Sequence, residues 1–146
     1  MEFAEDWPLE GIDRVLTFLP AFESEGFQSC SWFAETAKAK GERVQLPYPT
    51  YSNTVEAFWS AFAETGGWID PYGPLPEDPA GELERTKAVV ATYPIDYLQS
   101  ASINQIRRYL CKCRRGERFC DGHIDDEFRQ GKIVAALRRL QELRKA

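Results

Sequence analysis

The chain has 146 residues, which is enough for one domain with a single hydrophobic core. Hydrophobic residues make up 43% of it and aromatic residues 13%, and this composition excludes an intrinsically disordered protein. The net charge of −5 combines an acidic part up to residue 102, with 6 Lys+Arg against 17 Asp+Glu, and a basic part from Ile103 onward, with 12 against 6. Such a division indicates either a basic face for an acidic partner or two parts that complement each other within one fold.

The sequence predicts neither a membrane span nor a leader peptide. No stretch approaches the ~18 uncharged apolar residues that a transmembrane helix needs. The opening residues, MEFAEDWPLE, are acidic where a signal peptide is basic, and no apolar core follows them. We therefore expect a cytoplasmic protein whose four cysteines stay as thiols.

The N-terminal part begins with an amphipathic helix. Its apolar residues recur at helical spacing, and Pro20 stops or kinks the helix after Ile12, Val15, Leu16 and Leu19.

The next segments are less regular. Residues 29–42, SCSWFAETAKAKGE, fit a short helix capped by Ser31 and closed by Gly41, although FQSCSWF also fits an extended strand. The stretch VQLPYPTYS is predicted to be extended, because Pro47 and Pro49 disfavour a helix at and before themselves.

The clearest helix signal follows at residue 53. Asn53 and Glu56 fit a capping box, and Gly66 is placed to end the helix. Its buried stripe is predicted to contain Val55, Phe58, Trp59 and Phe62.

A long loop then separates this helix from the next. GGWIDPYGPLPEDPAG is dense in Gly and Pro, and its Trp68, Ile69 and Tyr72 are expected to pack on the core. Asp78 followed by Pro79 predicts the start of another helix, which ends before Pro94.

The C-terminal part predicts two more helices. Ser102 and Gln105 form a second capping box, and the apolar stripe that follows ends near Gly116. A last helix is predicted from its cap, Asp121, toward Leu143, and Gly131 is a position at which this helix can be broken into two. The fold class is therefore mainly α: residues 1–146 form a single compact domain of short helices with one long Gly/Pro/aromatic loop.

Four possible metal ligands lie close together in the C-x-C-x6-C-x2-H string of Cys111, Cys113, Cys120 and His123. Their number suffices for tetrahedral zinc. In a helix, however, Cys111 and Cys113 are about 200° apart at ~100° per residue, so their sulfurs cannot share one ion. A Cys120–His123 nucleophile and base is the other alternative, but no oxyanion-hole motif accompanies it. We predict buried thiols, with no metal and no cofactor.

The run RRGERFCDGHIDDEFRQGKIVAALRRL, with LPYPTYSNTVEAFWSAFAETGGWID upstream, resembles a bacterial domain family of unknown function. Members of that family share an R-G-E-R-F-x-x-G-H block, then a glycine and an R-R-L helix. The resemblance covers Ile12 to Leu143 and implies a mainly α, single-domain fold without implying a mechanism.

The residues of this block each have a predicted structural role. Gly116 is expected to end a helix in a left-handed conformation, and Glu117 and Arg118 lie at the turn. Phe119 is expected to reach the core and anchor the turn. Asp121 caps the last helix, and Gly122 lets two helices approach closely.

Three functions fit these observations. The first is a non-catalytic interaction module that binds a protein through the aromatic loop at Trp68 and Tyr72. The second is nucleic-acid binding through the basic helix and turn at residues 107–118, which carry Arg107, Arg108, Lys112, Arg114, Arg115 and Arg118. A sequence pI near 5.0 argues against a dedicated nucleic-acid binder.

The third function is a metal-dependent hydrolase that uses the acidic cluster at residues 121–127, where Asp121, Asp125, Asp126 and Glu127 lie near His123. A simpler account is that acids gather in the first turn of a helix because the helix dipole favours them. No P-loop, H-E-x-x-H or G-x-S-x-G motif is present. We therefore rank binding of a protein partner above binding of nucleic acid, and both above catalysis. Nothing in the sequence indicates the oligomeric state.

Overall fold

The computed structural model describes residues 6–33, 48–70, 73, 75, 77–78 and 93–145. Helices dominate these residues, and the described strands are two short segments that form an antiparallel pair. The mainly α prediction is therefore confirmed.

The predicted N-terminal helix is divided into two. Helix α1 spans Leu9–Leu16, and the short helix α2 spans Leu19–Phe22. Pro20 lies in the first turn of α2, where its missing N–H has no intrahelical acceptor to lose. Thr17 and Phe18 separate the two helices, and both precede the proline. Pro20 therefore lies at the start of a helix and does not interrupt one.

The extended interpretation of the segment around Ser31 is the correct one. Strand β1 spans Cys30–Phe33 and pairs with β2, Tyr48–Tyr51, with Cys30 opposite Tyr51. A helix capped by Ser31 is therefore wrong, and Gly41 lies outside the described residues. Aromatic residues are enriched in strands because they fit a pleated, half-buried surface. The extended course predicted around Pro49 is confirmed.

Helix α3 spans Asn53–Glu64 and begins one residue earlier than predicted. Ser52 is its cap, and the Ser52 hydroxyl accepts a hydrogen bond from the Val55 N–H. Asn53 is already helical, so the predicted Asn53–Glu56 capping box is wrong. Serine and asparagine are equally good N-cap residues, so the local sequence does not distinguish between the adjacent candidates Ser52 and Asn53. The predicted role of Gly66 is confirmed, since it follows the helix with φ +88°.

The loop after α3 packs inward where it is described. Ile69 is buried, and the Trp68 ring lies edge-on to Phe62 with 6.2 Å between centroids. Asp78 forms a backbone hydrogen bond with Leu75 in an isolated bridge. Tyr72 and Pro79 lie outside the described residues, as does the helix predicted after Asp78.

The described residues 93–145 contain four helices: α5 (Ile95–Gln99), α6 (Ile103–Glu117), α7 (His123–Arg129) and α8 (Lys132–Lys145). The capping box of Ser102 and Gln105 is present at the start of α6, as predicted. Gly131, with φ +76°, separates α7 from α8, which confirms its predicted role.

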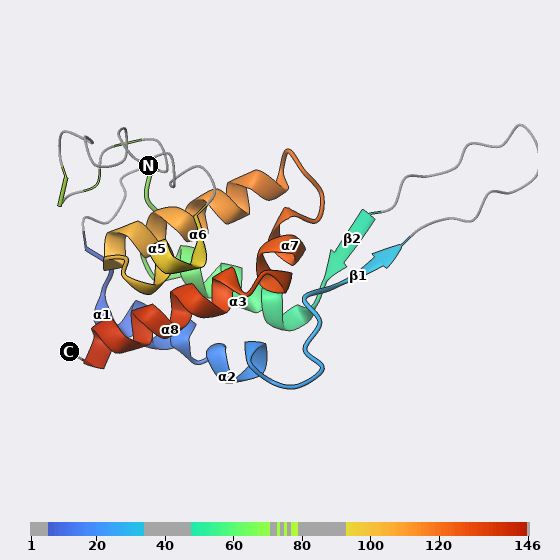
Figure 1. The fold of residues 1–146 in the computed structure, drawn as a ribbon, viewed down its shortest axis with the longest axis horizontal. Helices are drawn as coiled ribbons and strands as arrows, with labels where there is room; N and C mark the ends of the chain where they lie inside the picture. The colour runs from blue at the N-terminus through green and yellow to red at the C-terminus, as the bar shows by residue number, and fades with distance from the viewer. Residues whose placement is uncertain are drawn as a thin grey trace, which may run out of the picture.

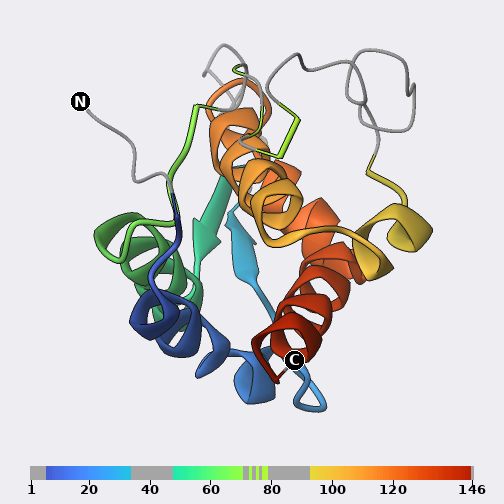
Figure 2. The ribbon, with the colours of Figure 1, turned by 90° about the vertical axis from the view of Figure 1, so that its left-hand side faces the viewer.

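The helices surround one core, and the two strands extend from one end of the molecule (Figure 1). Seen from the opposite end, α1 and α3 lie on the left, α8 lies at the lower right and contacts α1, and α6 lies across the top and contacts α8 (Figure 2). The largest fully buried apolar side chains come mainly from α1, α3, α5, α6, α7 and α8 and include Ile12, Phe58, Phe62, Leu98, Ile106, Tyr109, Ile124 and Leu137. Among the described helices, none is long and apolar enough to cross a membrane.

Charges of the acidic and basic parts meet on one side of the fold. On α8, Arg144 binds Asp13 of α1 at 2.8 Å, and Arg138 binds Glu23 beside α2. These pairs show that part of the C-terminal positive charge complements the N-terminal negative charge.

Two arginines of α6 are buried and hold the loop that follows α3. Arg107 has no exposed surface, and its guanidinium donates to the Gly66 and Gly67 carbonyls at 2.8 and 3.1 Å. It also donates to Asn104 Oδ1 at 2.8 Å. Arg108 donates in the same way to the Gly73 carbonyl. A buried carbonyl without a donor is costly, so these arginines stabilise the fold.

We predict that Arg107→Met lowers the free energy of unfolding by about 3 kcal/mol, because the substitution leaves buried carbonyls without a donor. Arg114→Met on the exposed face of the same helix is the matched control, and it is expected to change the value by less than about 0.5 kcal/mol. Urea unfolding followed by circular dichroism measures both. Equal effects of the two substitutions would contradict the structural role of Arg107.

Candidate binding surface at the α6–α7 corner

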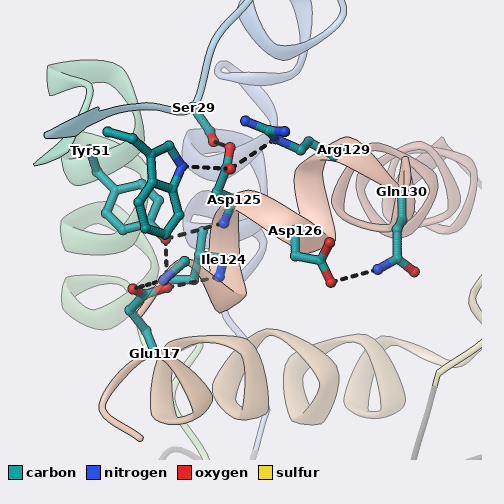
Figure 3. Close-up of polar contacts among 10 residues, drawn as sticks. Ser29, Tyr51, Glu117, Ile124, Asp125, Asp126, Arg129 and Gln130 are labelled. Atoms are coloured by element: carbon teal, nitrogen blue, oxygen red, sulfur yellow. Dashed lines mark hydrogen bonds and ion pairs between the residues drawn. The ribbon is translucent and has the colours of Figure 1, made fainter. Parts of the chain in front are cut away.

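The corner between α6 and α7 is held by the carboxylate of Glu117. One oxygen accepts a hydrogen bond from the Gly122 N–H at 2.7 Å, and the other accepts from the Ile124 N–H at 2.8 Å (Figure 3). These amides lie at the start of α7, where backbone N–H groups lack intrahelical acceptors and the helix dipole favours negative charge. The last residue of α6 therefore caps α7 from outside that helix.

Tyr51 connects the same carboxylate to β2. Its hydroxyl donates to Glu117 at 2.5 Å and accepts from the Asp125 N–H at 3.2 Å. Burial raises the pKa of the Tyr51 hydroxyl, and the hydrogen bond to the Glu117 carboxylate raises it further. The phenol therefore remains a proton donor at neutral pH, and one side chain ties together β2, α6 and α7.

Two glycines permit the close contacts of this corner. A Cβ on Gly116 would lie 2.6 Å from the Cδ2 atom of His123, and a Cβ on Gly122 would overlap the ring of Trp32. Gly122 also has φ +90° and is the residue before α7. The prediction that Gly116 ends a helix in a left-handed conformation is wrong, because α6 continues through it to Glu117.

Two further predictions for this corner are wrong. Asp121 is exposed and does not cap α7, because Glu117 occupies that position. Phe119 does not reach the core, since 81% of its surface is exposed. The turn is anchored by the carboxylate of Glu117, which leaves the aromatic side chain directed outward.

The second polar cluster is centred on Asp125 of α7. Its Oδ1 accepts from the Ser29 hydroxyl at 2.5 Å, and its Oδ2 accepts from the Trp32 indole at 3.1 Å. Arg129, one turn further along α7, forms an ion pair with Oδ2 at 2.9 Å. Burial alone would raise the pKa of Asp125, but these hydrogen bonds and the guanidinium hold it below the ordinary value. The cluster fixes β1 against α7.

A groove of about 510 Å³ lies beside this cluster. One wall is the consecutive segment from Phe27 to Trp32, and the other consists of Asp125, Phe128 and Arg129. Its size is within the ~300–1,000 Å³ of binding clefts. Trp32 is 43% exposed, lines this groove and lies against Gly122, three residues after Phe119 in the turn.

Residues 7–146 match a family of unknown function, DUF6508. The chain belongs to this family. No curated protein and no solved structure matches the chain. Membership in a family of unknown function agrees with that part of the resemblance inferred from the sequence. It assigns no chemistry, so a functional proposal for this member depends on its side chains.

The basic side chains predicted for residues 107–118 do not share one surface. Arg107 and Arg108 are buried, and Lys112 lies 5.5 Å from the centroid of the Tyr93 ring. Arg115 is partly buried and has interactions of its own. Arg114 and Arg118 are exposed, and neither forms an ion pair with another residue that the structure describes.

The acidic side chains of residues 121–127 also point apart. Asp125 faces Ser29, Asp126 binds Gln130 at 2.7 Å, and Glu127 accepts from the Tyr109 hydroxyl at 2.7 Å. Asp121 is exposed. In the described part of the chain, no three His, Cys, Asp or Glu side chains gather where they could hold a metal ion.

The cysteines are separated in the same way. Helix α6 is regular through Cys111 and Cys113, both are buried, and burial raises their thiol pKa values, that of Cys111 to about 11. Cys120 is exposed on the turn. The predicted separation of the two helical sulfurs is therefore confirmed.

Helical spacing in the sequence does not predict the role of Trp32, the groove or the exposure of Phe119. A residue-by-residue helical pattern describes what a helix buries, whereas these residues lie on a strand and a turn. The sequence contains one indication of the exposure of Trp32: FQSCSWF fits a strand as well as a helix. In a strand, successive side chains point to opposite faces, so some of them are exposed.

We predict that Glu117→Ala lowers the free energy of unfolding by about 2 kcal/mol, because it removes the acceptor for two amides at the start of α7. Asp121→Ala is the matched control and is expected to change the value by less than about 0.5 kcal/mol. Urea unfolding of both variants measures the difference. A larger loss of stability in Asp121→Ala than in Glu117→Ala would show that Asp121, and not Glu117, caps α7.

We also predict a pH dependence of stability that involves Asp125. Its folded pKa is depressed, so its contribution is complete above the ordinary carboxyl pKa near 4 and is lost as the pH falls through the lower folded value. The Asp125→Asn variant lacks this contribution, so its free energy of unfolding should approach that of the unmodified protein as the pH falls from 6 to below 4. Parallel curves for the two proteins would contradict a depressed pKa.

Proposed function

We propose that this protein is a non-catalytic module that binds a protein partner through the α6–α7 corner. The contact residues are Trp32, Arg114, Arg118 and Phe119, which we call the corner surface. The observation that carries the proposal is the 81% exposure of Phe119 on a turn that other residues hold in place.

The physical argument concerns the free energy of exposed apolar surface. Burying an aromatic ring contributes roughly 25 cal/mol per Å², which amounts to a few kcal/mol for phenylalanine. Glu117 fixes the turn without using this ring, so the gain is available to a partner. Aromatic and arginine side chains are also the types that contribute most to protein interfaces.

The surroundings of Phe119 support a partner with an apolar pocket and an acidic rim. Arg114 and Arg118 are one helical turn apart, and both are exposed. The aromatic loop at Trp68 is less suited to this role, because Trp68 packs on Phe62. The proposed contact surface therefore moves from the loop to the corner.

The same geometry favours a protein over nucleic acid or a substrate. Burial of Arg107 and Arg108 removes two of the six basic residues on which nucleic-acid binding rested. The divergent carboxylates of residues 121–127 are poorly arranged for metal-dependent hydrolysis.

The remaining expectations belong to this proposal. A cytoplasmic location is supported by four cysteines without a disulfide. We also infer that the family is bacterial, as the resemblance implies, and that its members share the R-G-E-R-F-x-x-G-H block. A Cβ on Gly116 or Gly122 would overlap a neighbouring ring, and Glu117 accepts hydrogen bonds from two amides at the start of α7, which supports the shared block.

We predict that a photo-crosslinking amino acid at position 119, introduced in cells, captures one protein. The same group at position 9, where Leu9 is also exposed, is the control. Arg114→Glu combined with Arg118→Glu should abolish the crosslink. The captured protein, once purified, should bind Phe119→Ser at least 10-fold more weakly than the unmodified protein, as expected for an interface hot spot.

Two results would contradict the proposal. One is equal capture at positions 9 and 119, which would show that the corner surface has no specific partner. The other is tight binding of duplex DNA or of RNA in fluorescence anisotropy that weakens steeply with salt and is lost in the double arginine variant, which would establish the nucleic-acid alternative.

A further inference from the structure

The register of the two strands determines which backbone groups of β1 remain available. In an antiparallel pair, residues opposite each other alternate between exchanging both backbone hydrogen bonds and exchanging none. The Ser52 N–H donates to the Ser29 carbonyl at 2.9 Å, so Ser29 is in the bonded series. Ser31 and Phe33 follow in that series, and the backbone groups of Cys30 and Trp32 point away from β2.

Pro49 agrees with this assignment and distinguishes the two edges of the sheet. It stands opposite Trp32 and has no N–H to donate. Its position makes the outer edge of β2 a poor template for another strand, as prolines commonly do at sheet edges. The outer edge of β1 retains the donors of Cys30 and Trp32, which bond to no other backbone group in the described part of the chain.

The groove lies along this edge of β1. Successive side chains of a strand point to opposite faces of the sheet. Cys30, Ser31 and Trp32 are consecutive and all line the groove, so the groove must follow the edge of the strand and not one of its faces. The facing wall is α7, whose Asp125 holds the ring of Trp32 and the guanidinium of Arg129. The groove is therefore open beside unpaired backbone groups and is bounded by fixed side chains.

The side chains around the groove indicate what would fit. Arg129 is bound to Asp125 through Nε, and 70% of its side chain is exposed, which leaves its terminal nitrogens accessible to an anion. Phe27 and Phe128 form an apolar surface, with ring centroids 5.4 Å apart. The site combines backbone donors and acceptors, a cation and an apolar surface.

We propose that an extended segment of the protein partner adds to the outer edge of β1 as a third strand, with an acidic side chain facing Arg129 and an apolar one facing Phe27 and Phe128. The available groups of Cys30 and Trp32 are two residues apart, about 6.6–6.8 Å along the strand, which is the spacing that a bound strand presents. A compact small molecule does not match this repeat. The inference rests on the proposed function and identifies which part of the partner binds beside the corner surface.

The experiment selects ligands and then removes one backbone donor. Random hexapeptides are displayed and selected on the unmodified protein, and the enriched peptides are synthesised. Cys30→Pro removes the outward N–H of Cys30 at the first residue of a strand, where proline is tolerated. Cys30→Ala removes the same thiol and keeps the N–H, so it is the matched control. Circular dichroism and urea unfolding establish that both variants fold.

We expect the selected peptides to contain an acidic residue and an apolar residue in an extended pattern. Binding should weaken about 10-fold or more in Cys30→Pro and less than about 3-fold in Cys30→Ala. Amide hydrogen exchange provides a second measurement that does not require the variant: peptide binding should slow exchange at Cys30 and Trp32 at least 10-fold. A peptide in which the acid is replaced by its amide should bind more weakly.

The inference is overturned if no hexapeptide is enriched, or if enriched peptides leave exchange at Cys30 and Trp32 unchanged. It is also overturned, with the proposed function intact, if the protein captured at position 119 binds Cys30→Pro and Cys30→Ala equally well. A third outcome is that peptides bind β1 but no protein is captured at position 119. That result would support the strand site and contradict the proposed corner surface.

Discussion

The interaction on which the corner depends is the hydrogen bonding of the Glu117 carboxylate to the first amides of α7. The carboxylate ends one helix and begins the next, so the turn between them needs no apolar anchor. The hydroxyl of Tyr51 joins the same group and brings β2 to the corner. Because a charged acceptor satisfies two amides and a phenol at once, the direction of α7 is set by electrostatics and not by packing alone.

The position of α7 determines the rest of the candidate surface. Asp125 projects from α7 and binds Ser29 and Trp32, which fixes β1 and the groove beside it. The glycines of the corner let the Trp32 ring and the His123 ring approach the backbone. A rigid set of polar contacts therefore supports an exposed phenylalanine, an exposed tryptophan and an open strand edge, which is the arrangement expected of a preorganised binding site.

The sequence was sufficient for much of the helical framework. The capping box at Ser102, the buried stripe of α6 and the breaks at Gly66 and Gly131 depend on local spacing, and each is present. The corner was not predictable in the same way. A glutamate at the end of a helix looks like an ordinary surface residue unless the position of the following helix is known. The local sequence therefore favours Asp121 as the cap and Phe119 as the anchor, and both predictions are wrong. Similarly, burial of Arg107 depends on carbonyls 40 and 41 residues away in the chain.

The most direct test of this account is amide hydrogen exchange at Gly122 and Ile124, compared between the unmodified protein and Glu117→Ala. We expect both amides to be protected in the unmodified protein and to exchange much faster in the variant, while the amides in the middle of α8 keep their protection. Protection at Gly122 and Ile124 that is unchanged by the substitution would show that the Glu117 carboxylate does not hold α7.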